Sequence, residues 1–128
     1  MASPAGTSPI LIVEDHDDSR ELLQQVLEKA GYRTTGCGSG LEALTALQSG
    51  ERPCLILLDL NMPDVNGLGF RAEQQRHEDV KDIPILVMSG VAEPRDYHAN
   101  LKAIGYLRKP FDVTEVLAFV QKACGVPQ

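Results

Sequence analysis

Short apolar runs alternate along the chain with longer segments in which apolar residues recur every three or four positions. The runs at 10–13 and 55–58 are aliphatic without polar interruption, which is typical of strands buried on both faces of a sheet. The longer segments have the period of a helix with one buried face. The pattern predicts strands over 9–15, 32–37, 54–59, 83–89 and 106–109, and helices over 17–31, 39–50, 67–79, 93–104 and 113–125.

The same pattern predicts helix ends and core faces. Asp18 stands three residues before Glu21, which is the spacing of a capping box, and Gly31 marks the end of that helix. The residues expected to face the core are Leu22, Leu23, Val26, Leu27 and Ala30 in the first helix, Leu41, Leu44 and Leu47 in the second, and Val113, Val116, Leu117 and Val120 in the last.

Alternation of five strands with five helices requires crossover connections, and hence a largely parallel sheet with helices on both faces. We therefore predict a doubly wound α/β fold, with one (βα)5 domain over 9–125, flexible tails at 1–8 and 126–128, and no effector domain in this chain. Ligands of such sheets bind at the carboxyl ends of the strands, so candidate chemistry is expected there.

Composition refines this picture by exclusion. The formal net charge is −6, so no excess of Lys and Arg is available for direct binding to a nucleic-acid backbone. No apolar run approaches the roughly 20 residues that span a bilayer. The first residues also lack the basic and apolar regions of a signal peptide. These features predict a cytoplasmic protein without a membrane or nucleic-acid partner.

The cysteines are Cys37, Cys54 and Cys124, which are odd in number, widely spaced and in no C-x-x-C pair. This spacing indicates neither a disulfide framework nor a zinc site. Free cysteine is among the most buried residue types, so we predict three buried free thiols.

The ends of the predicted strands carry the candidate chemistry. Glu14 and Asp15 follow the first strand, Asp59 ends the third, Ser89 ends the fourth and Lys109 ends the fifth. Three adjacent carboxylates call for a neutralising cation, and Mg²⁺ prefers such oxygen ligands. A hydroxyl and an ammonium beside them suit a phosphoryl group. Taken singly, the acidic pair could cap a helix and Asp59 could be a turn residue, but their coincidence at four strand ends favours phosphoryl chemistry.

On these residues the chain resembles the receiver domain of two-component response regulators, in the CheY-like superfamily. The motifs that carry the resemblance are ILIVEDHDDSR at 10–20, LILLDLNMPDVNG at 55–67, PILVMSG at 84–90 and GYLRKPF at 105–111. The resemblance extends from about Ile10 to Cys124 and implies a five-stranded parallel sheet in the flavodoxin-like order 2-1-3-4-5.

The resemblance implies a phosphoacceptor and a metal site. Asp59 matches the aspartate that takes a phosphoryl group from the phosphohistidine of a histidine kinase or histidine phosphotransfer protein. Glu14 and Asp15 match the acidic pair that, with Asp59 and the backbone carbonyl of Asn61, would bind Mg²⁺, with Mn²⁺ as a substitute.

The resemblance also implies a switch. Ser89 and Lys109 match the residues that contact the phosphoryl oxygens, and Tyr106 matches the aromatic residue that turns inward when the hydroxyl residue moves. The Lys109–Pro110 bond matches a peptide that receivers usually hold in cis.

Three features depart from the family pattern. The first acid is Glu14 where Asp is commoner, and the hydroxyl residue is Ser89 where Thr is commoner. The segment from Ser89 to Lys109 is about two residues shorter than usual, which predicts a short or partly irregular fourth helix. Dimerisation through the face of the fourth helix, fifth strand and fifth helix is therefore in doubt.

We predict a phosphoacceptor that catalyses only its own phosphorylation and hydrolysis and signals to an unknown downstream protein, either as a stand-alone regulator or as a piece of a larger regulator or hybrid kinase. A phosphatase of the haloacid-dehalogenase type is one alternative, but it would need a second Asp two residues after the nucleophile, where this chain has Asn61. A flavodoxin-like electron carrier is a second alternative, but it would need Gly, Ser and Thr to bind phosphate in the loop after the first strand, where this chain has the acidic segment DHDDSR. A third alternative, an interaction module that is never phosphorylated, is opposed by the presence of all five key groups.

Overall fold

The computed structural model describes residues 8–60, 67–90 and 102–127, and its sheet confirms the predicted doubly wound fold. The strands are parallel, in the order β2-β1-β3-β4-β5. They are β1 (Ile10–Val13), β2 (Thr34–Cys37), β3 (Leu55–Asp59), β4 (Ile85–Ser89) and β5 (Gly105–Arg108). The helices within the described residues are α1 (Asp17–Lys29), α2 (Gly40–Gln48), α3 (Gly67–Gln75) and α5 (Val113–Cys124). None of them is long and apolar enough to cross a bilayer.

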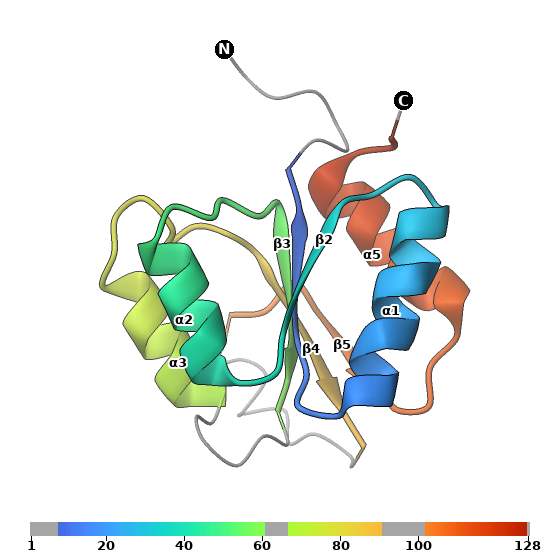
Figure 1. Cartoon of the computed structure of the whole chain (residues 1–128), viewed down its shortest axis with the longest axis horizontal. Helices are drawn as coiled ribbons and strands as arrows, with labels where there is room; N and C mark the ends of the chain where they lie inside the picture. Colours follow the sequence, from blue (N-terminus) through green and yellow to red (C-terminus); the bar gives the residue numbers. More distant parts are fainter. Residues whose placement is uncertain (1–7, 61–66, 91–101, 128) are drawn as a thin grey trace.

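The helices form two layers around the sheet. Helices α1 and α5 cover one face, and α2 and α3 cover the other (Figure 1). Alternate residues of each strand enter different cores, so that Ile10 and Ile12 pack on the α1 and α5 side while Leu11 and Val13 pack on the α2 and α3 side. The central strands are therefore buried on both faces, as their apolar runs predict.

The predicted helix over 93–104 lies mostly outside the described residues. Its last three positions, 102–104, are described and are not helical, so the predicted end of this helix is wrong. Lys102 has a φ of 54°, and the backbone N–H of Ile104 donates to the carbonyl of Ile85 at 2.8 Å. The N–H of Ile104 is therefore bonded to strand β4 and is not available for a hydrogen bond within a helix.

The predicted core stripes are only partly correct. Leu23, Leu27 and Leu47 are buried, but Leu22 and Leu41 are 62% and 65% exposed, and Val113 is 46% exposed. A helix that packs on a flat sheet buries a narrow line of residues, and the flanks of its apolar stripe stay exposed unless a neighbouring helix closes over them.

Helix α1 begins differently from the prediction. Its N-cap is His16, which makes no side-chain capping hydrogen bond, so the predicted capping box at Asp18 is wrong. Asp17 and Asp18 lie in the first turn instead, where negative charge interacts favourably with the helix dipole. Gly31, with a φ of +99°, follows the end of the helix as predicted.

The prediction of three free thiols is also wrong. Cys54, just before β3, and Cys124, the last residue of α5, form a disulfide between Cα atoms 5.3 Å apart. The pair is separated by 70 residues, and only packing of α5 against the sheet brings the two sulfurs together. Cys37 is buried and free, as predicted.

Gly105 in β5 lies close to Phe119 of α5. A Cβ atom at this position would lie 2.3 Å from Cε1 and 2.5 Å from Cζ of Phe119. We expect Gly105→Ala to lower the free energy of unfolding by about 1–3 kcal/mol, the usual range for overpacking, in a urea titration.

The matched control is Gly36→Ala in the edge strand β2. There the added Cβ meets only the flexible end of the Gln24 side chain, at 2.8 Å, which can rotate away. We expect a change within about 0.5 kcal/mol. Equal losses in the two variants would contradict the assignment of a tight contact to Gly105 alone.

Candidate active site

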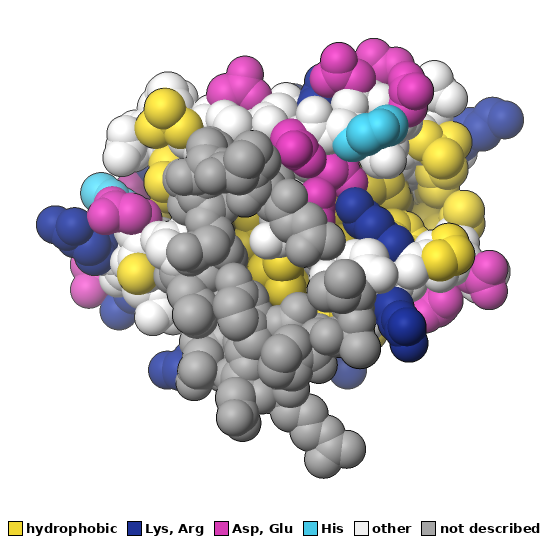
Figure 2. Space-filling view, turned by 90° about the horizontal axis from the view of Figure 1, so that it is seen from below, with side chains coloured by type: hydrophobic (Ala, Val, Ile, Leu, Met, Phe, Trp, Pro, Cys, Tyr) yellow, Lys and Arg dark blue, Asp and Glu magenta, His cyan; other side chains and the backbone are white. Residues whose placement is uncertain are grey.

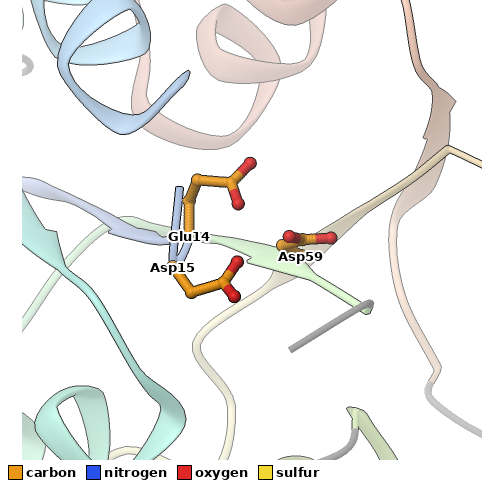
Figure 3. Close-up of side chains that lie close together, drawn as sticks. All are labelled: Glu14, Asp15 and Asp59. Carbon is orange, nitrogen blue, oxygen red and sulfur yellow. The ribbon is translucent and has the colours of Figure 1, made fainter. Parts of the chain in front are cut away.

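The acidic residues of the candidate site lie at the carboxyl ends of two neighbouring strands. Val13 of β1 is in register with Leu58 of β3, so Glu14 comes to lie beside Asp59. Asp15 follows on the loop to α1. One carboxylate oxygen from each of these three residues lies within 4.8 Å of the others. Figure 3 shows the three side chains converging from the ends of β1 and β3.

The three carboxylates differ in their exposure to solvent. Glu14 is 1% exposed and Asp59 is 3% exposed, whereas Asp15 is exposed. Buried carboxylates are rare unless they are paired or bind a cation. Figure 2 shows acidic side chains gathered at this end of the molecule, next to hydrophobic side chains. The site is therefore a pair of buried carboxylates with a third carboxylate at the surface.

Lys109, directly after β5, contributes the positive charge. Its Nζ lies 2.7 Å from Oε1 of Glu14 and donates a hydrogen bond to it, and it lies 3.5 Å from Oδ2 of Asp59. The shorter contact is thus to Glu14. Its backbone N–H donates to the carbonyl of Ser89 at 2.7 Å, which fixes the start of the side chain.

The pKa values follow from this arrangement. Burial raises the pKa of Glu14 above its ordinary value, and the neighbouring Asp59 raises it further, while Lys109 opposes both effects. Burial by itself would lower the pKa of Lys109, but the hydrogen bond to Glu14 and the charge of Asp59 raise it overall. Lys109 therefore stays protonated, and one ammonium serves two buried carboxylates.

Arg20 organises the loop that carries the acidic pair. Its Nη1 donates to the backbone carbonyl of Glu14 at 2.9 Å, and its Nη2 donates to Oδ1 of Asp17 at 2.7 Å. The N–H of His16 also donates to Oε2 of Glu14 at 3.3 Å. No role for Arg20 is predicted from the sequence pattern. Its place on the first turn of the helix after the acidic pair was the available signal, because that turn faces the loop.

Of the remaining predicted residues, one lies at the same edge of the sheet, one lies within β5 and one lies outside the described residues. Ser89 is fully buried at the end of β4, next to β3, where Asp59 is in register with Met88. Tyr106 in β5 is half-buried against the core on the α2 and α3 side. Asn61 lies outside the described residues. The Lys109–Pro110 peptide is cis, as predicted.

The donor atoms at this site fit a hard divalent cation. Three carboxylates and one ammonium leave a formal charge of −2, and every anionic donor is oxygen. Mg²⁺ favours oxygen ligands and binds through a few carboxylates while it keeps several waters. The exposed Asp15 leaves one side of the cluster open to solvent, as such a partly hydrated ion requires.

The family model for the response regulator receiver domain matches residues 10–121. The chain belongs to the response regulator receiver family. Receiver domains are signalling phosphoacceptors of two-component phosphorelays and bind Mg²⁺ at an acidic site. Their partners are histidine kinases or phosphotransfer proteins. The family assignment leaves the phosphatase and electron-carrier alternatives without support.

Three relatives illustrate the similarity. Polar-differentiation response regulator DivK from Brucella ovis is 31% identical over 123 residues, covering 93% of this chain and 98% of DivK. Sporulation initiation phosphotransferase F from Bacillus subtilis is 33% identical over 113 residues, covering 88% of this chain and 90% of that protein.

The third relative is a solved structure. The receiver domain of sensor histidine kinase PA1611 from Pseudomonas aeruginosa superposes with a TM-score of 0.81 at 28% identity, covering 92% of this chain and 98% of that one. It was solved with a magnesium ion coordinated in its active-site cleft. The similarity to these relatives therefore extends over nearly the whole of this receiver domain.

Proposed function

We propose that this receiver domain accepts a phosphoryl group on Asp59 from a phosphohistidine and signals by a change of surface. The observation that carries the proposal is a buried carboxylate at the end of β3 with Lys109 and Glu14 in reach, in a chain of the receiver family. The test is incubation with Mg²⁺ and acetyl phosphate, followed by the intact mass of the protein.

The transfer step uses the geometry at the strand ends. A carboxylate oxygen of Asp59 attacks phosphorus as the bond from phosphorus to the imidazole nitrogen breaks, and the electron pair of that bond stays on the imidazole. Lys109, 3.5 Å from Asp59, places its charge where the phosphoryl oxygens would gather. Because its shorter contact is with Glu14, the ammonium is already positioned before the phosphoryl group arrives.

Glu14, Asp15 and Asp59 would hold Mg²⁺, and the backbone carbonyl of Asn61 is proposed as a further ligand. The bound cation would neutralise the carboxylates and the incoming phosphoryl oxygens. Arg20 keeps the loop after β1 in place through the carbonyl of Glu14, so that the acidic pair is held toward Asp59. Mn²⁺ is a substitute with the same preference for oxygen.

The proposed switch connects the site to β5. A phosphoryl group on Asp59 would attract the hydroxyl of Ser89, which lies on the neighbouring strand β4. Tyr106 is half-buried on β5, two strands from Asp59 in the sheet order. Its side chain would then turn inward and change the surface around β5. The downstream protein would read that surface.

An apolar groove beside the site is where we propose that the phosphohistidine partner docks. The groove, of about 460 Å³, lies between α1 and α5 and is called here the α1–α5 groove. Glu14 and Lys109 line it together with apolar residues, so it is continuous with the site. A protein that brings a phosphohistidine to Asp59 must cover this surface, and an apolar helix face is a complementary occupant. The apolar lining residues are Leu22, Leu23, Val26, Pro110, Phe111, Val113 and Val116.

Leu22→Asp tests this docking surface. Leu22 lines the α1–α5 groove and is 62% exposed, so the change should leave the fold intact. We expect phosphoryl transfer from a phosphohistidine protein to slow by about 10-fold or more, because a central apolar contact is worth roughly 1–2 kcal/mol. Phosphorylation by acetyl phosphate should stay unchanged, because a small donor needs no docking.

The control is Leu41→Asp on α2, where the leucine is 65% exposed and does not line the groove. It should leave both reactions unchanged. An equal loss of protein-donated transfer in Leu41→Asp, or no loss in Leu22→Asp, would place the docking surface elsewhere while leaving the phosphoacceptor proposal standing.

A further inference from the structure

The Cys54–Cys124 disulfide lies at the end of the sheet opposite the acidic site. Cys54 directly precedes β3, whereas Asp59 is the last residue of that strand. Five strand residues separate the two ends by roughly 17 Å. The disulfide therefore joins the amino end of the central strand to the carboxyl end of α5, without touching the phosphoacceptor.

Two further contacts hold the same end of α5. The hydroxyl of Tyr32 donates a hydrogen bond to the carbonyl of Gly125 at 2.7 Å. Pro127 packs so closely on Gly31 that a Cβ added to this glycine would lie 2.9 Å from the proline Cβ. We call the disulfide and these two contacts the α5 clasp. The disulfide is its covalent member, and the other two contacts are non-covalent.

The chemical setting of the disulfide conflicts with the predicted location of the protein. The sequence predicts a cytoplasmic protein, and cytosolic thiols are kept reduced by glutathione and thioredoxin. Disulfides that occur there are usually transient or redox-sensing. In the reducing compartment that the sequence predicts, a bond between two cysteines held this close together would form or break with the redox state of its surroundings.

We propose that Cys54 and Cys124 are a reversible oxidation site that exchanges with small-molecule thiols and disulfides of the glutathione type, fastening or releasing the carboxyl end of α5. The proposal is independent of phosphorylation at Asp59. It assigns a second input to this receiver domain, at the end of the sheet away from the acidic site.

Oxidation of the two cysteines by a small disulfide proceeds in two exchange steps. A cysteine thiolate attacks one sulfur of the small disulfide, whose S–S bond breaks, and a small thiolate leaves with the electron pair. The second cysteine thiolate attacks the protein sulfur of this mixed disulfide, and the second small thiolate leaves. Two cysteine thiols have lost two electrons, one small disulfide has gained them, and the two protons end on the released thiols.

Both oxidation states are accommodated by the surroundings of Cys54. Its Sγ lies 3.6 Å from the carbonyl oxygen of Ser8 and 3.7 Å from that of Pro9, so a reduced thiol has acceptors for its S–H. Cys54 is half-buried, whereas Cys124 is buried at 9% exposure. Cys54 is therefore the sulfur that a small thiol reaches first.

Opening of the disulfide would loosen the clasp and act on α5 as a whole. Its first turns line the α1–α5 groove through Val113 and Val116, and Phe119 packs on Gly105. A bond that closes a loop of 70 residues restricts the unfolded chain strongly. The oxidised form should thus unfold at a higher temperature, by about 10 °C, and protect the amides of the last turns of α5.

The experiment equilibrates the full chain in glutathione buffers of graded redox ratio, blocks free thiols under denaturing conditions and counts them by mass. We expect three free thiols in reducing buffer and one in oxidising buffer, with a Cys54–Cys124 cross-linked peptide and full return on reduction. Three thiols at every ratio would overturn the proposal. A bond that reduced glutathione opens only after denaturation would overturn it too, because the bond would then be permanent.

Variants separate release of α5 from a general effect of oxidation. Cys54→Ser should abolish the redox dependence of the thermal unfolding midpoint. It should also abolish the redox dependence of amide hydrogen exchange in α5. The matched control is Cys37→Ala, which should keep both responses, because burial raises the pKa of the Cys37 thiol to about 11 and leaves it unreactive. Equal exchange of α5 amides in the oxidised and reduced wild type would overturn the release step. Phosphorylation by acetyl phosphate is expected to differ by less than about 2-fold between the two forms.

Discussion

Asp59→Asn is expected to abolish the Mg²⁺-dependent gain of one phosphoryl group from acetyl phosphate. The amide keeps the shape of the carboxylate but cannot form the acyl phosphate, because its oxygen is a poor nucleophile. The side chain is 3% exposed and lies at the end of β3, within reach of Lys109. Intact mass after incubation measures the result directly.

The variant should fold, which makes the loss of phosphorylation interpretable. Asp59 stands beside Glu14, whose pKa is raised partly by the Asp59 carboxylate, so removing that charge relieves repulsion. We expect a thermal midpoint equal to or above that of the wild type. The control is Asp18→Asn, an exposed residue on the first turn of α1, which should be phosphorylated normally. Phosphorylation of the Asp59→Asn variant would show that another residue is the acceptor. Absence of phosphorylation in the wild type would favour the alternative that the protein is an interaction module.

Lys109→Met is expected to slow phosphorylation by about 10²–10³-fold, the usual effect of removing one group that stabilises charge in a transition state. Methionine keeps much of the volume of the side chain and removes the ammonium that contacts Glu14 at 2.7 Å and Asp59 at 3.5 Å. A time course of intact mass with acetyl phosphate and Mg²⁺ measures the rate. Lys29→Met, an exposed lysine in the last turn of α1, is the control and should react at the wild-type rate.

The same variant has a second, independent readout in its stability. Without Lys109, the buried carboxylates of Glu14 and Asp59 lose their ammonium partner. We expect the free energy of unfolding to fall by about 1–3 kcal/mol. This is less than for a fully buried ion pair, because Lys109 is 30% exposed. In the native wild type the pKa of Glu14 is raised above its ordinary 4.5, and loss of Lys109 removes an effect that lowers it.

The direction of the pH dependence follows from these pKa values. A raised native pKa means that the native state binds more protons than the unfolded state between the two values, so stability falls as pH rises through that window. The loss in Lys109→Met should therefore be larger at pH 7 than at pH 5 in urea titrations. A loss that is independent of pH would show that the ammonium does not compensate Glu14.

Much of the candidate site could be predicted because its parts are local in sequence. Each of Glu14, Asp59 and Ser89 directly ends or follows an apolar run, and such runs are recognisable from their composition alone. Parallel strands place their carboxyl ends at one edge of the sheet, so local positions become spatial neighbours without knowledge of any contact.

The pairing of charges within that edge could not be predicted in the same way. Lys109 was expected to face a phosphoryl group on Asp59, and the structure shows that its shorter contact is to Glu14, 95 residues away. Such a choice depends on a difference of less than 1 Å between two contact distances, 2.7 Å to Glu14 and 3.5 Å to Asp59, made by side chains from different strands. Arg20 and its hydrogen bond to the Glu14 carbonyl were missed for the same reason.

The sequence by itself determined the alternation of strands and helices, and with it the parallel sheet and the edge that carries the acids. Only the tertiary structure decided that Cys54 meets Cys124 across 70 residues and that Leu22 stays exposed in the α1–α5 groove. The physical reason is the range of the interactions. Periodicity is set by residues within one or two turns of each other, whereas a disulfide or a groove needs two whole elements to be placed side by side.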